Sequence, residues 1–229
     1  MTSNAEQGSS ADDLVVAKGS FAAMGGAERD LMRNLPALAQ RFSVSVATLH
    51  SVPELESLCS GLGVPLISSD ETWEVPTDAL STVLDSGMDS AVEAWAGCSG
   101  LAEALVACDA LHLVSGDGSL ALLQHVPDSV AVDLHLLEPH RGLHEDVLHR
   151  EIDGSPKRSL GLTSALLSRA RRRDIEAIRG LTDRPRSAIS GNSSYTAARI
   201  GDVYGVEAGV LLPSVVSDEF PTEAGLDES

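Results

Sequence analysis

Short apolar runs alternate with helical patterns along almost the whole chain. The apolar runs predict strands at 14–17, 43–49, 64–68, 110–114 and 129–135, and the helical patterns between and after them lie at 27–40, 54–62, 92–108 and 160–179. Such alternation is typical of a mostly parallel sheet with helices on both faces. The sequence therefore predicts a Rossmann-like α/β domain at 14–213, after a polar leader at 1–13 and before an acidic tail at 214–229.

A proline inside one helical pattern and the length of two others predict the ends of these helices. Pro36 lies inside the first pattern, so we expect a kink or an early end of that helix. The patterns at 92–108 and 160–179 are long enough to predict one continuous helix each.

The charge balance restricts the partners of the chain. Its 229 residues include 34 acidic and 16 basic side chains, giving a formal net charge of −18. This balance opposes nucleic-acid binding, because such proteins neutralise phosphates with Lys and Arg. An acidic, lysine-poor surface is typical of proteins from a salt-loving (halophilic) cytoplasm, although a GC-rich genome would also replace Lys by Arg.

The cysteines and the hydropathy pattern predict a soluble, cytoplasmic protein. Cys59, Cys98 and Cys108 are odd in number and lack CxxC spacing, so we expect reduced, buried thiols. The chain does not open with a signal-peptide pattern, and no apolar stretch approaches the length of a membrane span.

The stretch 186–213 predicts a short strand, a capped helix and a second short strand. Ser193 and its neighbours offer side-chain oxygens to the free amides of a helix that begins near Tyr195. Gly205 stands where a left-handed helix end is expected, and Pro213 stops the apolar run at 210–212.

This stretch resembles the end of the N-terminal domain in family 4 glycosyltransferases of the GT-B fold. The family pattern is N-S-x-x-T-x-x-x-I-x-x-x-Y-G followed by V-x-x-P-x-V, and the matching positions here are Asn192, Ser193, Thr196, Ile200, Tyr204, Gly205, Val210, Pro213 and Val215. The resemblance implies the acceptor-side half of a GT-B fold, and it includes Ser193 among the substrate-binding residues. A serine-capped helix in any other α/β protein is the alternative.

A second match lies after the first predicted strand. Gly25, Gly26, Glu28 and Arg29 fit the family's G-G-x-E-R, and the helix that follows ends in a matching L-A-x-R-F. Glycine lets a backbone approach a phosphate closely, and the free amides at a helix start attract anions. The resemblance implies that Gly25, Gly26 and Glu28 bind the substrate at the interdomain cleft. A glycine-rich turn without a ligand remains the alternative.

Four of the seven histidines lie between residues 133 and 149. His135 ends a predicted strand, where ligands of parallel sheets gather, and the family has a histidine at this strand end that faces the cleft. A gapless match places that histidine at Leu137, so His135 takes the role only with a two-residue insertion. Arg141 fits the end of the family's H-T-P-x-R and would hold an anionic group.

Metal binding is a further alternative for the histidines. His140 and His144 share a face if their segment is helical, with Glu145 or Asp146 as additional ligands. No HExxH-like pattern accompanies the pair, and GT-B enzymes need no metal for catalysis, so we expect neither metal nor cofactor. Exposed loop positions are the default for His144 and His149.

The last long helical pattern is basic. Residues 157–186 carry nine of the 16 basic side chains, and Arg171 and Asp174 match an R-x-x-D of the family. Family members with lipid-linked acceptors dock on anionic membranes through such helices, which implies peripheral contact with the inner membrane face. A solvated helix face is the alternative.

The resemblance therefore implies a hexosyltransferase-like glycosyltransferase domain with His135 near the reacting sugar. It would move a sugar from a nucleotide-sugar to a lipid-linked or glycan acceptor, with the donor-binding function, absent here, supplied by a further domain or a partner chain. Alone, the chain is expected to be inactive. Two alternatives stay open: a non-catalytic acceptor-binding or regulatory half-transferase, and another Rossmann-like protein that binds a small molecule, such as an epimerase.

Overall fold

The protein folds around one parallel sheet. The computed structural model describes residues 11–76, 86–157 and 159–214. Within them the strand order is β3-β2-β1-β4-β5-β6-β7, and every neighbouring pair is parallel. The strands are β1 (Asp13–Ala17), β2 (Ser43–Thr48), β3 (Leu66–Ser68), β4 (Ala110–Val114), β5 (Ala131–His135), β6 (Ala188–Gly191) and β7 (Gly209–Val210). The predicted Rossmann-like α/β fold is confirmed, with β1 starting at Asp13 inside the expected leader.

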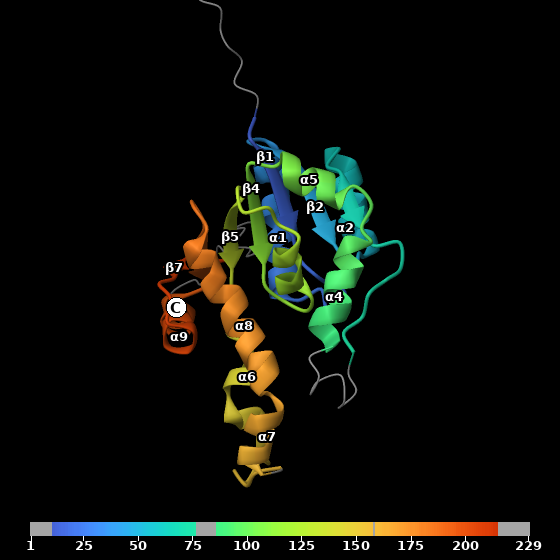
Figure 1. The fold of residues 1–229 in the computed structure, drawn as a ribbon. Coiled ribbons are helices and arrows are strands. Elements are labelled where there is room, and N and C mark those ends of the chain that lie inside the picture. Colours follow the sequence, from blue (N-terminus) through green and yellow to red (C-terminus); the bar gives the residue numbers. More distant parts are fainter. Residues whose placement is uncertain (1–10, 77–85, 158, 215–229) are drawn as a thin grey trace, which may run out of the picture.

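Helices cover both faces of the sheet (Figure 1). One core packs α1 (Gly26–Ala39) and α2 (Pro53–Leu62) on the sheet, and a larger core packs α4 (Ser86–Ala96), α5 (Leu101–Ala107), η1 (Ser119–Gln124), α8 (Ser168–Gly180) and α9 (Ser194–Tyr204) on the other face. The strands divide between the cores by their period of two. In β1, Val15 and Ala17 enter the larger core and Val16 the smaller one.

Three expectations about helices need correction. The predicted early end at Pro36 is wrong, because α1 continues through this residue to Ala39. Proline lacks one backbone N–H, and the complete burial of the neighbouring Leu35 stabilises the helix against the loss of that hydrogen bond. The helix expected at 92–108 begins earlier and divides into α4 and α5, since Gly100 adopts φ 80. The helix expected at 160–179 likewise divides into α7 (Leu160–Leu166) and α8 at Leu167.

The predicted strand-helix-strand at 186–213 is confirmed. Ser193 Oγ accepts a hydrogen bond from Thr196 N at 3.1 Å and caps α9. Gly205 ends that helix with φ 68. The apolar face that the helix buries includes Ile200 and Tyr204.

An arm projects beyond the carboxyl ends of the strands (Figure 1). It consists of α6 (Arg141–His144), η2 (Asp146–His149), α7 and the first half of α8. Several large apolar side chains of the arm are exposed: Val147, Ile152, Leu162 and Leu166.

A buried carboxylate attaches the arm to the body. Asp174 Oδ2 on α8 lies 2.7 Å from His144 Nε2 on α6 and accepts a 2.8 Å hydrogen bond from Tyr204 Oη on α9. The rings of His144 and Tyr204 meet edge to face. The default interpretation of His144 as an exposed loop residue is therefore wrong, because its side chain is 9 % exposed.

Candidate functional site

The strand order reverses between β1 and β4, and the loops after these strands flank this switch point. In open α/β sheets, ligands bind outside the carboxyl ends of the strands at such a point. The loop after β1 leads into the glycine pair at the start of α1, and the loop after β4 leads into η1. This edge of the sheet is the candidate site.

A buried ion pair lies between the two loops. Lys18 directly follows β1, and its Nζ is 3.2 Å from Glu28 Oε1 on the first turn of α1. The same Nζ donates a 3.0 Å hydrogen bond to the carbonyl of Ser115 at the end of β4. Lys18 is 3 % exposed and Glu28 is 7 % exposed. A buried charge is tolerated only when it is paired, and each of these residues supplies the charge that the other needs.

Close backbone contacts join the same two loops. Gly19 N donates a 2.9 Å hydrogen bond to Ser119 Oγ. A Cβ atom on Gly19 would stand 1.9 Å from the carbonyl oxygen of Asp117, so only glycine fits there. A Cβ atom on Gly116, which has φ +152, would stand 2.5 Å from Lys18 Nζ. The switch point is consequently filled by the protein's own backbone and by the Lys18 side chain.

His135 ends β5 on the same edge, as the sequence predicts. It is 5 % exposed, and its Nδ1 lies 3.2 Å from Ser190 Oγ at the end of β6. Its ring stacks on that of His112, with 6.4 Å between the ring centroids. Burial, and secondarily His112, lower the pKa of His135, which favours the neutral imidazole. A neutral imidazole can accept or donate one proton at each nitrogen, depending on the tautomer.

His112 holds a carboxylate on the neighbouring strand. Its Nδ1 lies 2.7 Å from Asp133 Oδ2, and both side chains are partly exposed. Together with His135 and Ser190 they form a polar row across β4, β5 and β6, on the face that α1 and α2 partly cover. Asp133 contacts His112 whereas Ser190 contacts His135, so these described side chains do not form a Ser-His-Asp triad on one histidine.

The structure brings some of the predicted residues together and separates others. Gly25 precedes α1 as its N-cap, Gly26 begins it, and Glu28 follows in its first turn, so these three lie at the switch point. Arg141 instead begins α6 and pairs with Glu145 at 3.2 Å. Ser193 lies at the carboxyl end of β6, where its hydroxyl caps α9.

Sequence reasoning missed Lys18, Ser115 and Ser119. Lys18 gave a usable signal, because it is one of only two lysines and directly follows the first predicted strand. Ser115 and Ser119 gave none: their roles depend on the approach of two loops about a hundred residues apart.

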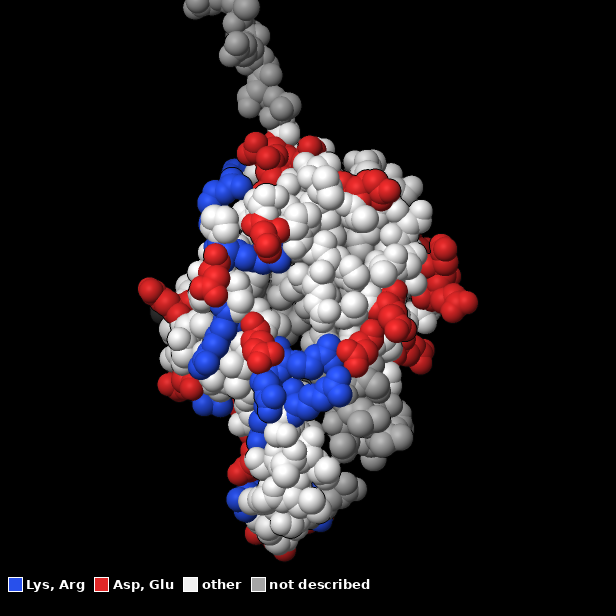
Figure 2. Space-filling view, viewed as in Figure 1, with Lys and Arg blue, Asp and Glu red and all other residues white. Residues whose placement is uncertain are grey.

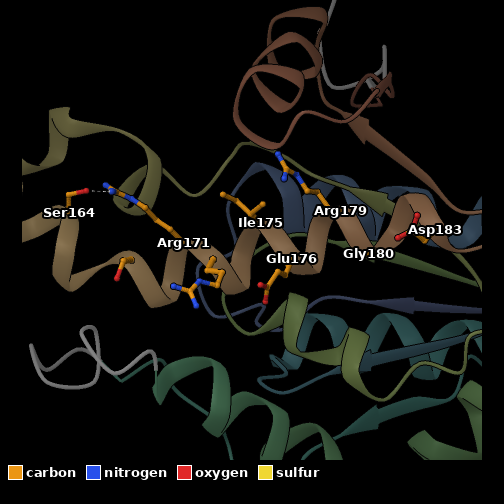
Figure 3. Close-up of a pocket in the computed structure, with 9 residues that line it drawn as sticks. Ser164, Arg171, Ile175, Glu176, Arg179, Gly180 and Asp183 are labelled. Carbon is orange, nitrogen blue, oxygen red and sulfur yellow. Dashed lines mark hydrogen bonds between the residues drawn. The ribbon is translucent and has the colours of Figure 1, made fainter.

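A groove on α8 is a separate candidate for a ligand site (Figure 3). It has a volume of about 630 Å³, and its lining includes Arg171, Ile175 and Arg179. Both arginines are engaged within the protein: Arg171 Nη1 donates to Ser164 Oγ at 2.7 Å, and Arg179 Nε to the Tyr204 carbonyl at 2.6 Å. The groove follows one side of a helix and lacks the convergence of loops found at the switch point.

The side chains of the alternative histidine metal site contact other residues. Glu145 pairs with Arg141 and Arg199, and His144 with Asp174. Over 11–76, 86–157 and 159–214, no three His, Cys, Asp or Glu side chains are grouped so that they could hold a metal ion. In the same ranges, no helix is long and apolar enough to cross a membrane.

Comparisons with known proteins show weak likeness to solved structures. A UGT transferase from Siraitia grosvenorii, solved in complex with UDP, shares 13 % identity over 87 % of this chain, with a TM-score of 0.45. A UDP-N-acetylglucosamine 2-epimerase from Listeria monocytogenes shares 10 % identity over 92 % of this chain and 71 % of its own, with a TM-score of 0.33. BdcA in complex with NADPH shares 10 % over 80 % of this chain and 69 % of its own, with a TM-score of 0.35.

The chain spans half the length of the Siraitia transferase. No family model and no curated protein matches it. These neighbours include a transferase solved with UDP and a UDP-N-acetylglucosamine 2-epimerase, but their TM-scores are below 0.5 and carry no argument about function.

Proposed function

We propose that this chain is the acceptor-side domain of a family 4 glycosyltransferase of the GT-B fold. It works with a donor-binding domain outside these residues and moves a sugar from a nucleotide-sugar to a lipid-linked or glycan acceptor. The observation that carries the proposal is the convergence of Gly25, Gly26, Glu28 and His135 on one edge of the sheet. The motif resemblance selects the first three directly and His135 with a two-residue insertion, and these two segments are far apart in the sequence.

Each residue has a role in this proposal. The backbone amides at Gly25 and Gly26 face the phosphates of the donor, because the first amides of a helix have no partner within it. His135 lies near the reacting sugar as a neutral imidazole, and Arg141 binds an anionic group of the acceptor. The leaving diphosphate takes the acceptor proton, so this domain needs no strong base.

The experiment that tests this function is a calorimetric binding panel in low and in multimolar KCl. It contains UDP- and GDP-sugars, a short-chain polyprenyl diphosphate sugar as acceptor, and NADPH. We expect the acceptor to bind, the nucleotide-sugars to bind at millimolar concentration or not at all, and NADPH not to bind. Micromolar binding of one nucleotide-sugar would show a complete donor site in this chain. Micromolar binding of NADPH would favour a different Rossmann-like protein.

A second candidate function is a non-catalytic acceptor-binding or regulatory half-transferase. The observation that favours it is that the predicted side chains already have protein partners: Glu28 holds Lys18, Arg141 holds Glu145, and Ser193 caps α9. Assays with the donor domain of a family 4 enzyme added in trans separate the two functions. Transfer that requires this chain supports the enzyme; acceptor binding without transfer supports the binding module.

The arm supports contact with an anionic membrane as part of the proposal. Lys and Arg side chains gather where the arm meets the body, on the face shown in Figure 2. Beyond them the arm exposes apolar side chains, including Ile152, which is fully exposed. Basic and apolar side chains on one projecting element suit an anionic lipid surface.

Vesicle co-sedimentation tests this contact. We expect binding to phosphatidylglycerol vesicles but not to phosphatidylcholine vesicles, and loss of binding at ~1 M salt, where the screening length is ~3 Å. Ile152→Ser should weaken the binding. Val106→Ser is the matched control, because Val106 is also exposed, at 73 %, but lies on α5 in the body. Equal effects of both substitutions would exclude the arm.

A further inference from the structure

The Lys18–Glu28 pair lies at the switch point, the region where ligands bind in open α/β sheets. Lys18 Nζ lies between the loops after β1 and β4, bonded to the Ser115 carbonyl and paired with Glu28. Glu28 Oε2 stands 3.1 Å from the Cβ position of Gly25, so the carboxylate lies beside the start of α1. The pair therefore places a negative group of the protein where the proposed function needs a negative group of a substrate.

We infer that this pair is a displaceable closure of the site: a diphosphate of a ligand replaces the Glu28 carboxylate on the Lys18 ammonium, and Glu28 turns out to solvent. The inference rests on the proposed function for the choice of a diphosphate as the ligand group. It adds Lys18 as the anion-binding residue and Glu28 as the internal group that competes with the ligand.

One polar contact holds the Glu28 carboxylate, whereas several contacts hold the two loops. The exchange therefore moves the Glu28 side chain and leaves the loops in place. Among the described residues, Lys18 is the single polar partner of the Glu28 carboxylate. Glu28 lies on the first turn of α1, so the exchange requires its own side chain to rotate out of its buried position. The loops stay in place, because Gly19 is fixed against Asp117 and Ser119.

Once a diphosphate has reached Lys18, electrostatics favours its contact with the ammonium over that of the Glu28 carboxylate. A diphosphate carries more negative charge and more acceptor oxygens than one carboxylate, and its hydrogen bonds with an ammonium are charge-assisted. Lys18 stays paired throughout, so the exchange never leaves a buried charge alone. Glu28 regains full hydration. Competition from Glu28 weakens binding of the diphosphate. In the absence of ligand, Glu28 pairs with the buried Lys18 charge and so stabilises the folded site.

Calorimetric titration of inorganic pyrophosphate tests the inference with matched variants. Glu28→Gln removes the competing charge and should bind pyrophosphate at least tenfold more tightly than the wild type. Glu54→Gln is the control: it makes the same change in net charge on the first turn of α2, at an exposed position. It should leave the affinity within about twofold of the wild type. Lys18→Met combined with Glu28→Gln should abolish the binding.

A second substitution covers the case in which Glu28→Gln does not fold. Glu28→Asp keeps the charge but withdraws it by one methylene, and should also bind pyrophosphate more tightly than the wild type. The inference is overturned if neither Glu28 variant binds more tightly than Glu54→Gln, or if the double variant binds as well as Glu28→Gln. Pyrophosphate carries no sugar, base or lipid, so this result is independent of the acceptor binding that tests the proposed function.

Discussion

Asp174 is the side chain whose loss should most clearly loosen the arm from the body. Asp174→Ala removes the acceptor of the Tyr204 hydroxyl and the partner of His144 Nε2. A buried polar group left without a partner costs about 1–3 kcal/mol, so two such groups predict a loss of about 2–6 kcal/mol in the free energy of unfolding. Burial and the neighbouring Asp174 both raise the pKa of Tyr204, so its phenol stays neutral and keeps its proton for this bond.

Urea denaturation followed by circular dichroism measures the effect. Tyr204→Phe removes one of the two contacts and should cost about 1.5–3 kcal/mol, as for a hydrogen bond to a charged group. Glu176→Ala is the matched control, because Glu176 lies on the same helix but is exposed; it should stay within about 0.5 kcal/mol of the wild type. A loss below about 0.5 kcal/mol for Asp174→Ala would refute the reasoning that this carboxylate anchors the arm.

Three further predictions concern the body of the domain. Gly19→Ala should cost at least about 3 kcal/mol in urea denaturation, because its Cβ would meet the Asp117 carbonyl at 1.9 Å, whereas Gly61→Ala, with nothing within 4 Å, should not destabilise. Because the pKa of His135 is lowered in the folded state, the free energy of unfolding should be highest above the unfolded pKa of 6.5 and should fall as the pH drops toward the folded pKa. His135→Gln should flatten the dependence of the free energy of unfolding on pH in this range. Burial raises the pKa of Cys98 to about 11, so native protein at pH 8 should resist iodoacetamide until urea is added, and rapid native alkylation would contradict this.

Much of the fold could be predicted because its signals are local. The period of two in the strands, the Ser193 cap and the left-handed Gly205 each depend on residues a few positions apart. The divisions of two helices were missed because apolar spacing continues across them. The positive φ of Gly100 separates α5 from α4, and Leu167 lies at the division between α7 and α8.

The candidate site was harder to predict because its contacts are long-range. The sequence placed Gly25, Gly26, Glu28 and His135 on one edge, since the carboxyl ends of parallel strands share an edge. It did not reveal the hydrogen bond from Lys18 to the Ser115 carbonyl, which crosses the switch point. The R-x-x-D match illustrates the same limit: Arg171 donates to the Leu143 carbonyl and Asp174 contacts His144, so both side chains fasten α6 to α8.

The most direct test of the central claim is an amide chemical-shift map of the 15N-labelled chain titrated with a polyprenyl diphosphate sugar. The claim is that substrate binds at the carboxyl edge of the sheet, over the loops that Lys18 and Glu28 join. The account predicts that the largest shifts lie at residues 18–28 and 115–119. Shifts confined to residues 164–183, which line the α8 groove, would contradict it.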